Sequence, residues 1–316
     1  MTVTLDDIKQ AHQRIQPYIH CTPILQSTQL NKLFTCELFF KADNMQKVGA
    51  FKARGACNAL FSMTQEVLAN GVITHSSGNH GAALAWAAAM RNASCTVVMP
   101  ENAPQAKKDA VLSYGATVVY CEPTMTAREG TVTRLIEQQG ARLVHPYDDD
   151  LIIAGQGTAT LETLAQLDKP ADVLMTPVGG GGLLGGSAIV VKQSPHAGVT
   201  RVIGAEPEAA NDAWLGFRSG ARLAEFVPNT IADGLRGTVG VRNFEIITQH
   251  VDDILLASEA RIVEAMKLIW TRLKIVVEPS AAVPLAAIMD QPEQFNGKRV
   301  AIILSGGNLD LDALPW

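Results

Sequence analysis

The sequence has few cysteines, little charge and no long hydrophobic run, and each shortage excludes a class of protein. Its 316 residues include five cysteines, none of them in a CxxC pair. This odd number and wide spacing argue against a disulfide framework or a zinc site. The seven histidines also lack metal-ligand spacing, so a zinc hydrolase is not expected. We expect the cysteines to be small buried hydrophobic residues: Cys21, Cys36, Cys57, Cys95 and Cys121.

Charged residues make up 18% of the chain, and the formal net charge is −5. No broad basic surface is therefore expected to attract nucleic acid or an anionic membrane. The longest apolar helical stretch, residues 82–90, is too short to cross a bilayer, and the N-terminus lacks a basic segment followed by an apolar one. We therefore expect a cytoplasmic protein without a nucleic-acid or membrane partner.

Short runs of β-branched residues alternate with longer helical patterns, which is typical of βαβ units around a parallel sheet. The first block predicts strands over 71–75, 95–100 and 116–121, and helices over 81–90 and 104–114. The second predicts strands over 172–178, 201–205 and 299–304. The length and the 47% hydrophobic content favour two domains, and the acidic turn at 148–150 is a plausible boundary between the two blocks.

Lys52 is the residue most informative about function. It lies in the run 48–56, between an aromatic residue and small residues that begin an apolar helix. Poor solvation lowers the pKa of an ammonium group and frees the amine to attack an aldehyde. The pattern therefore favours a Schiff-base lysine, and the alternative is a surface lysine at the start of a helix.

A glycine-rich run over 179–186 follows a predicted strand and precedes an apolar helix. Its unhindered N–H groups can converge on a phosphate at the positive end of that helix. The spacing Gly180-x-Gly182-x-x-Gly185 also matches the dinucleotide fingerprint, and Glu206 lies near the distance expected for a ribose carboxylate. A nicotinamide-dependent oxidoreductase is therefore an alternative from another class.

Two further loops contain polar side chains next to predicted strands. The loop 76–80 offers hydroxyls, an amide and free N–H groups that suit a small carboxylate, although it could be only a helix cap. The loop 305–310 follows the last strand, where α/β sheets bind ligands, although it could be a simple chain reversal. Their presence together with Lys52 and the glycine run favours a binding site.

Over nearly its whole length the chain resembles the fold type II pyridoxal-phosphate enzymes, the tryptophan synthase β-like family. Within that family it is most similar to the branch of serine racemase, serine/threonine dehydratase and 3-hydroxyaspartate dehydratase. One departure is Ala50, where many relatives have serine. The resemblance rests on seven ordered motifs, at 21–24, 49–56, 76–81, 179–182, 230–235, 277–282 and 305–308.

This resemblance implies an α/β fold of two three-layer domains with parallel sheets and the cofactor in the cleft between them. The large domain would comprise residues 1–64 and 150–316, and the small domain residues 70–147. Pyridoxal phosphate would form a Schiff base with Lys52, which would then act as a base on the substrate Cα proton. The implied cofactor-binding residues are Phe51, Lys52, Asn79, Gly179, Gly180, Gly181, Gly182, Leu183 and Ser305.

The implied substrate-binding residues are Ser76, Ser77, Gly78, Asn79, His80 and Arg128. Ser77 matches the proton carrier of the racemase branch on the face opposite the lysine, or it could only bind the carboxylate. Arg128 would suit a second substrate carboxylate, and the alternative is a surface arginine. A structural Mg²⁺ or Ca²⁺ would be bound by Glu206, Asp212 and the carbonyl of Ala210, unless this is a solvated acidic turn.

The neutral hydroxyl of Ser305 opposite the pyridine nitrogen favours loss of a β-leaving group over transamination. The resemblance therefore implies a dehydratase of serine, threonine or 3-hydroxyaspartate, with an amino-acid racemase as the alternative. Another alternative is a relative that binds an amino acid without catalysing a reaction. A homodimer is the usual state of the family.

Overall fold

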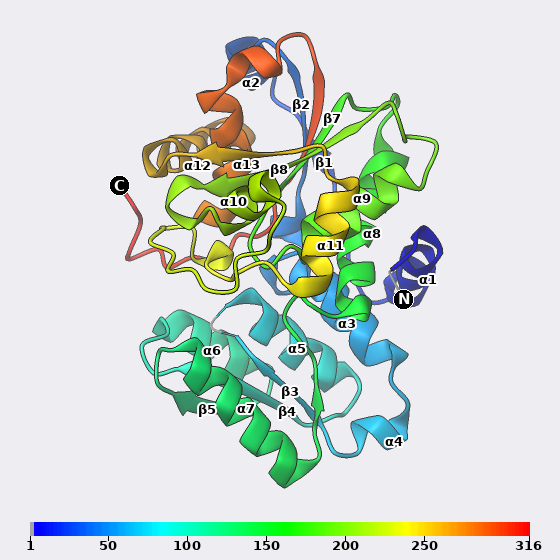
Figure 1. Cartoon of the computed structure of the whole chain (residues 1–316), viewed down its shortest axis with the longest axis vertical. Helices are drawn as coiled ribbons and strands as arrows, with labels where there is room; N and C mark the ends of the chain where they lie inside the picture. The colour runs from blue at the N-terminus through cyan, green and yellow to red at the C-terminus, as the bar shows by residue number, and fades with distance from the viewer. Residues whose placement is uncertain (1–2, 77) are drawn as a thin grey trace.

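The chain folds around two β-sheets, with the larger sheet in the upper half of Figure 1 and the smaller sheet in the lower half. The computed structural model describes residues 3–76 and 78–316. The larger sheet has the order β1 (Ile24–Leu25), β2 (Glu37–Lys41), β10 (Arg299–Ile303), β7 (Val173–Pro177), β8 (Arg201–Pro207) and β9 (Asp253–Ala257). The smaller sheet has the order β5 (Thr117–Cys121), β4 (Cys95–Pro100), β3 (Val72–His75) and β6 (Arg142–Leu143).

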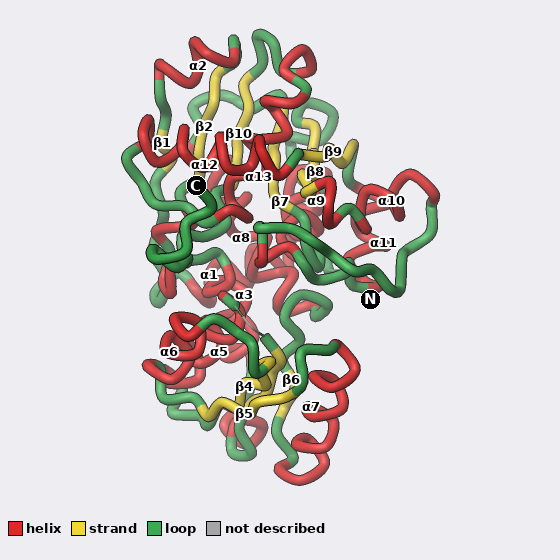
Figure 2. Tube along the Cα trace, turned by 90° about the vertical axis from the view of Figure 1, so that its left-hand side faces the viewer, coloured by secondary structure: helices red, strands yellow, loops and turns green. Residues whose placement is uncertain are grey.

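Helices lie on both faces of each sheet, and Figure 2 shows α7 on one side of the smaller sheet with α5 and α6 on the other. Those in the first half of the chain are α1 (Leu5–Ile15), α2 (Thr28–Phe34), α3 (Lys52–Ser62), α4 (Gln65–Leu68), α5 (Asn79–Met90), α6 (Gln105–Ser113), α7 (Met125–Gln139) and α8 (Asp150–Gln166). Those in the second half are α9 (Gly182–Lys192), α10 (Asp212–Ser219), α11 (Val241–His250), α12 (Glu259–Leu273) and α13 (Pro279–Asp290). Short 3-10 turns are η1 (Asp43–Met45), η2 (Lys47–Gly49), η3 (Glu208–Ala210), η4 (Asp233–Leu235) and η5 (Pro292–Gln294).

Alternation along the strands gives each sheet two buried faces. On β2, Leu38 and Phe40 pack with α12 and α13, whereas Phe39 packs on the opposite face with α9. In the smaller sheet, Val97 faces α5 and Val98 faces α7. Strands that are buried on both faces read as continuous apolar runs, which is why the sequence marks them clearly.

These observations confirm the predicted α/β class with parallel sheets, except at one edge. β1 pairs with β2 in the antiparallel direction, and all the other strand pairs of the described residues are parallel. The prediction that every cysteine is buried is wrong for Cys21, which is exposed beside Gln166, while all five are free thiols. Within residues 3–76 and 78–316, no helix has the length and apolarity needed to span a membrane.

A buried ionic cluster fixes the helix that begins at Lys52. Arg54 on α3 is fully buried, and its guanidinium donates to Asp43 at 2.7 Å and to Glu162 on α8 at 2.9 Å. Lys41 on β2 donates to Oε2 of Glu162 at 2.8 Å, an oxygen that also accepts from Arg54. Two cations and two carboxylates therefore neutralise each other in the interior, and removing one partner would leave an uncompensated buried charge.

Candidate active site

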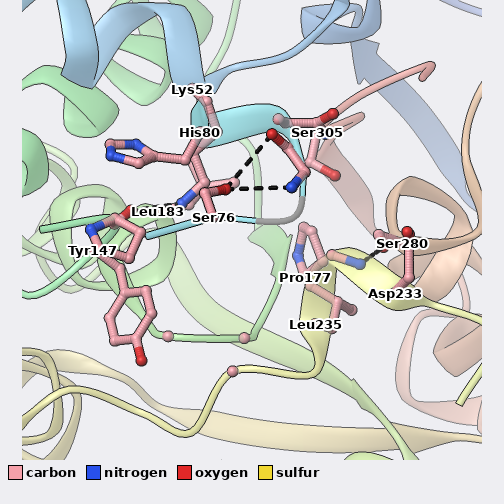
Figure 3. A pocket seen from close by; sticks show the side chains of 18 of the residues that line it. Lys52, Ser76, His80, Tyr147, Pro177, Leu183, Asp233, Leu235, Ser280 and Ser305 are labelled. Atoms are coloured by element: carbon pink, nitrogen blue, oxygen red, sulfur yellow. Dashed lines mark hydrogen bonds between the residues drawn. The ribbon is translucent and has the colours of Figure 1, made fainter. Parts of the chain in front are cut away.

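A pocket lies where the ends of both sheets face each other, and Figure 3 shows many of the residues that line it. The lining includes residues from the start of α3, the loop before α5, the glycine loop before α9 and the segment after β10. The carboxyl ends of parallel strands are the usual position of a ligand site in α/β sheets. The four segments that the sequence suggested as functional therefore meet in one pocket.

Lys52 begins α3 and extends into this pocket. Its Nζ donates to the carbonyl oxygen of Pro146 at 2.7 Å and lies 5.1 Å from the ring centroid of Phe51. Burial lowers the pKa of Lys52 from 10.5 to about 8, because the charged form loses hydration that one carbonyl does not replace. About a tenth of the Lys52 amine is therefore neutral at pH 7, far more than for an ordinary lysine.

The glycine loop before α9 leaves backbone N–H groups open to the pocket. Gly181 has φ +89°, a conformation that glycine adopts without strain, and a Cβ on Gly180 would lie 2.1 Å from Cγ of Tyr147. The first backbone bond of this turn runs from the Gly185 N–H to the Gly181 carbonyl. Within the described part of the chain, the N–H groups of Gly182 and Leu183 have no backbone acceptor. The loop is therefore suited to an anion.

The loop before α5 lies on the other side of the pocket. The Gly78 N–H donates to Oγ of Ser76 at 3.2 Å, and Asn79 and His80 form the first turn of α5. The His80 ring is buried, with Nε2 3.4 Å from the Val144 carbonyl, and burial followed by the nearby Lys52 charge holds its pKa well below 6.5. A neutral imidazole offers no cation, so a carboxylate would be bound here by helix N–H groups. Ser77 lies outside the described residues.

Two other predicted residues also line the pocket. Ser305 follows β10, is only 3% exposed, and accepts the Phe51 N–H through its carbonyl at 2.9 Å, which joins the lysine segment to the larger sheet. Arg128 lies on α7, and its buried Nε has no hydrogen-bond partner among the residues that the structure describes. An unpaired guanidinium in a pocket is a candidate for binding an anionic group. This placement does not support the alternative that Arg128 is a surface residue.

Several pocket residues were not assigned a role from the sequence. Lys107 on α6 forms an ion pair with Asp233 on η4, across the pocket, and Glu278 is buried beside Asn79. Asp233 and Glu278 belong to the motifs at 230–235 and 277–282, which was a usable signal. No sequence signal pointed to Lys107, because lysines on the exposed faces of helices are common.

The predicted cation ligands lie apart from the residues that line the pocket. Glu206, at the end of β8, accepts the N–H groups of Ala213 and Trp214 at 3.0 and 2.8 Å, and Asp212 accepts the Val239 N–H at 2.9 Å. Burial and then the Asp212 charge hold the pKa of Glu206 well above 4.5. Its position outside the pocket does not support the ribose role considered for Glu206.

Two buried carboxylates close to each other fit a hard cation, which would relieve their repulsion. Glu206 is fully buried, Asp212 is 4% exposed, and Ala210 is buried at the end of η3. In residues 3–76 and 78–316 no group of three or more histidine, cysteine or acidic side chains could hold a metal ion. A cation here would therefore need the Ala210 carbonyl and water as additional ligands.

The family model described as pyridoxal-phosphate dependent enzyme matches residues 15–306 of this chain. The chain belongs to the pyridoxal-phosphate-dependent enzymes. This membership replaces the nicotinamide oxidoreductase alternative.

Individual family members are also similar over the whole length. The chain is 49% identical to the β-hydroxyaspartate dehydratase of Paracoccus denitrificans (strain Pd 1222), over 99% of this chain and 98% of that protein. It is also 49% identical to the serine racemase of Dictyostelium discoideum. Superposition on the crystal structure of that enzyme gives a TM-score of 0.92 and includes 98% of this chain and 100% of the other. The crystal structure of a T.th. threonine deaminase has 43% identity and a TM-score of 0.92, covering 98% of this chain and 99% of its own.

The pocket fits the cofactor of this pyridoxal-phosphate family. An aldehyde requires a neutral amine, and the Lys52 amine provides it. A phosphate requires several convergent N–H donors, and the glycine loop provides them at the start of α9. Both groups line one pocket, so the residues present suit the two ends of pyridoxal phosphate.

Proposed function

We propose that this protein is a pyridoxal-phosphate-dependent dehydratase that converts a small β-hydroxy amino acid to the 2-oxo acid and ammonia. One observation supports this most directly: the low-pKa amine of Lys52 lines the same pocket as the loop before α5 and the glycine loop before α9. A dehydratase among the relatives adds to this support. Serine, threonine and 3-hydroxyaspartate are the candidate substrates.

In this proposal the first turn of α5 binds the substrate carboxylate. The N–H groups of Asn79 and His80 point from a helix N-terminus, where negative charge is stabilised, and the Ser76 hydroxyl and Gly78 lie beside them. The neutral His80 ring adds no charge to this turn. Its contribution is therefore through the backbone, which holds the carboxylate against the rigid end of the helix.

Residues on the opposite wall would hold the cofactor. The N–H groups of the glycine loop, from Gly179 to Gly182 with Leu183, would bind its phosphate, and Asn79 would donate to its ring oxygen. Phe51 would pack beside the ring, and the Ser305 hydroxyl would face the pyridine nitrogen. When bound, pyridoxal phosphate supplies an electron sink for negative charge at the substrate Cα.

Lys52 would move the proton at the reacting carbon. As a neutral amine it accepts the Cα proton from one face, and general base catalysis of this kind typically contributes a factor of about 10² to 10⁴. Lys52 would then pass this proton to the β-hydroxyl, which leaves as water, and one water molecule would convert the resulting enamine to the 2-oxo acid and ammonia. Because Ser305 is uncharged, it would not force the ring nitrogen of a bound cofactor to stay protonated, which would favour elimination over transamination.

A racemase is the second candidate, because the serine racemase of Dictyostelium discoideum is as similar to this chain as the dehydratase. Racemisation needs a second proton carrier on the face opposite Lys52, and we propose Ser77 for this role. Arg128 would bind the distal group of the substrate, and its unpaired Nε would suit the second carboxylate of 3-hydroxyaspartate. Loss of Arg128 should therefore affect 3-hydroxyaspartate more than serine.

Other proposals concern the assembled protein. We infer that Glu206, Asp212 and the Ala210 carbonyl bind a structural Mg²⁺ or Ca²⁺, supported by the two buried carboxylates. We also propose that residues 1–64 and 150–316 form one domain and residues 70–147 another. A cytoplasmic homodimer is a further proposal, which light scattering and fractionation would test.

The experiment is to incubate the cofactor-loaded protein with both enantiomers of each candidate amino acid. Keto acid, ammonia and the opposite enantiomer are measured for wild type, Lys52→Ala and Ser77→Ala, with the exposed Ser113→Ala as a matched control. We expect keto acid from at least one substrate and a loss of about 10²-fold or more in Lys52→Ala. If wild type gives neither keto acid nor the opposite enantiomer, the proposal is wrong.

The Ser77→Ala variant separates the two activities. If Ser77 is the second proton carrier, the variant loses racemisation and D-substrate turnover but keeps elimination from the L-enantiomer. Unchanged activity toward both enantiomers would exclude that role.

A further inference from the structure

Asn79 is held by a hydrogen-bond network that crosses the pocket between the two sheets. Its Nδ2 donates to both carboxylate oxygens of Glu278, at 2.9 and 3.1 Å, and its Oδ1 accepts from Nδ2 of Asn308 at 3.0 Å. Asn79 begins α5 beside the smaller sheet, whereas Glu278 precedes α13 and Asn308 follows β10 in the larger-sheet half. One amide is therefore held by two partners from the other half of the molecule.

The surrounding contacts allow only one orientation of the Asn79 amide. Asn308 also donates through Nδ2 to the Val48 carbonyl at 2.7 Å, so its NH₂ group is fixed toward these two acceptors. A flipped Asn79 would put its oxygen opposite the Glu278 carboxylate and its NH₂ opposite another NH₂. Both contacts would be repulsive. The second N–H of Asn79 is consequently the group that this amide can offer to a ligand in the pocket.

Glu278 itself is tightly built into this network. It is only 3% exposed, it accepts the Asn308 N–H through Oε2 at 3.1 Å, and its own N–H donates to the Gly306 carbonyl at 3.1 Å. A Cβ on Gly306 would lie 2.7 Å from Oε1, so the glycine makes room for the carboxylate. A buried carboxylate that accepts hydrogen bonds from both asparagines has a fixed position from which to hold the amide.

We propose that Glu278 and Asn308 are positioning residues that orient Asn79 as a hydrogen-bond donor to an anionic oxygen on the bound cofactor ring. This inference rests on the proposed cofactor contact of Asn79 and extends it to two residues without an assigned role. Neither residue needs to touch the reacting atoms. Their effect is transmitted through the orientation of one amide.

The charge on Glu278 links this network to pH. Burial raises the pKa of Glu278 from 4.5 to about 7, the charge of Asp233 on η4 adds to the rise, and the contacts of Asn79, Lys107 on α6 and Asn308 oppose it. Below that pH the protonated carboxyl of Glu278 keeps only one good acceptor oxygen. The Asn79 amide and the Asn308 N–H then compete for it. The hold on Asn79 therefore weakens as pH falls.

The test compares wild type, Glu278→Gln and the isosteric Asn308→Asp, with the exposed Glu264→Gln as control. Each cofactor-free protein is titrated with pyridoxal phosphate between pH 6 and 8.5, and the absorbance of the bound cofactor is recorded. At pH 8 we expect Glu278→Gln to bind about 10- to 100-fold more weakly, because a charge-assisted contact is lost. Below pH 7 its affinity should fall less steeply than that of wild type, because only the protonation of Lys52 then weakens binding, and the bound absorbance band should shift.

The same preparations distinguish this inference from the proposed reaction. Wild-type affinity, absorbance and pH dependence in both Glu278→Gln and Asn308→Asp would overturn the positioning role, whatever the enzyme catalyses. Weakened binding in both variants would support it even if wild type transformed none of the candidate amino acids. If Glu278→Gln does not fold, as judged by its thermal midpoint without cofactor, Asn308→Asp decides: unchanged binding and absorbance overturn the inference.

Discussion

The basicity of Lys52 can be measured without the cofactor, by the pH dependence of its reaction with a small aldehyde. With a pKa of about 8 in place of 10.5, about 9% of the Lys52 amine is neutral at pH 7, against about 0.03% for an ordinary lysine. The structure thus predicts roughly a 300-fold larger reactive fraction. The cause is burial, so Phe51→Ser, which admits water beside the amine, should move the midpoint back toward 10.5.

The assay is reductive methylation of the cofactor-free protein by formaldehyde from pH 6 to 10.5, with each lysine followed by peptide mass spectrometry. Lys32, which is exposed, serves as the internal reference. Lys52 labelling should reach half its limiting rate near pH 8. A midpoint near 10.5 in wild type, or no change in Phe51→Ser, would refute the argument that burial activates this amine.

The shifted pKa also predicts how stability depends on pH. The unfolded chain binds more protons at Lys52 than the folded chain between about pH 8 and 10.5, so the destabilisation caused by burying this ammonium decreases as pH rises through that window. The test is to measure the thermal midpoint of the cofactor-free protein across this pH range, for wild type and for Lys52→Met. An equal slope in both proteins would contradict the prediction.

Three further predictions concern the surroundings of the pocket. Gly180→Ala should weaken pyridoxal phosphate binding in a titration, because the added Cβ would lie 2.1 Å from Tyr147; unchanged affinity would contradict the proposed phosphate loop. Arg54→Met should lower the free energy of unfolding by about 3–5 kcal/mol in urea denaturation, since its carboxylate partners stay buried without it. Saturating Ca²⁺ should stabilise the fold by about 2.7 kcal/mol at one hundred times its Kd. This effect should be absent in Glu206→Gln, and a calorimetric scan with and without EDTA measures it.

Local sequence patterns located most of the strands and helices around the site. The strand predicted over 71–75 is β3 at Val72–His75, and the helix predicted over 104–114 is α6 at Gln105–Ser113. Gly115 ends that helix with φ +79°, a conformation that the sequence indicates because glycine adopts it without strain. These features depend on neighbours within a few residues, so they can be inferred from the chain without its fold.

The antiparallel edge strand and the exposure of Cys21 could not be inferred in this way. β1 has only two residues, too few for a periodic signal, and its direction depends on where the chain crosses the sheet edge. Cys21 lies in the loop just before that strand, where the fold leaves it uncovered. A preference for buried cysteine is an average over proteins, whereas exposure is set by the particular packing.

The order of motifs along this chain identified its family and cofactor and predicted Lys52 as the reactive lysine, because the aldehyde and phosphate of the cofactor need recognisable residue types in short segments. Only the tertiary structure decided how those segments work together. Lys107 meets Asp233 across 126 residues of sequence, and Asn79 meets Glu278 across 199. Such pairs form where the two sheets pack against each other. Local sequence preferences extend over only a few residues, so they cannot predict contacts between residues this far apart in the sequence.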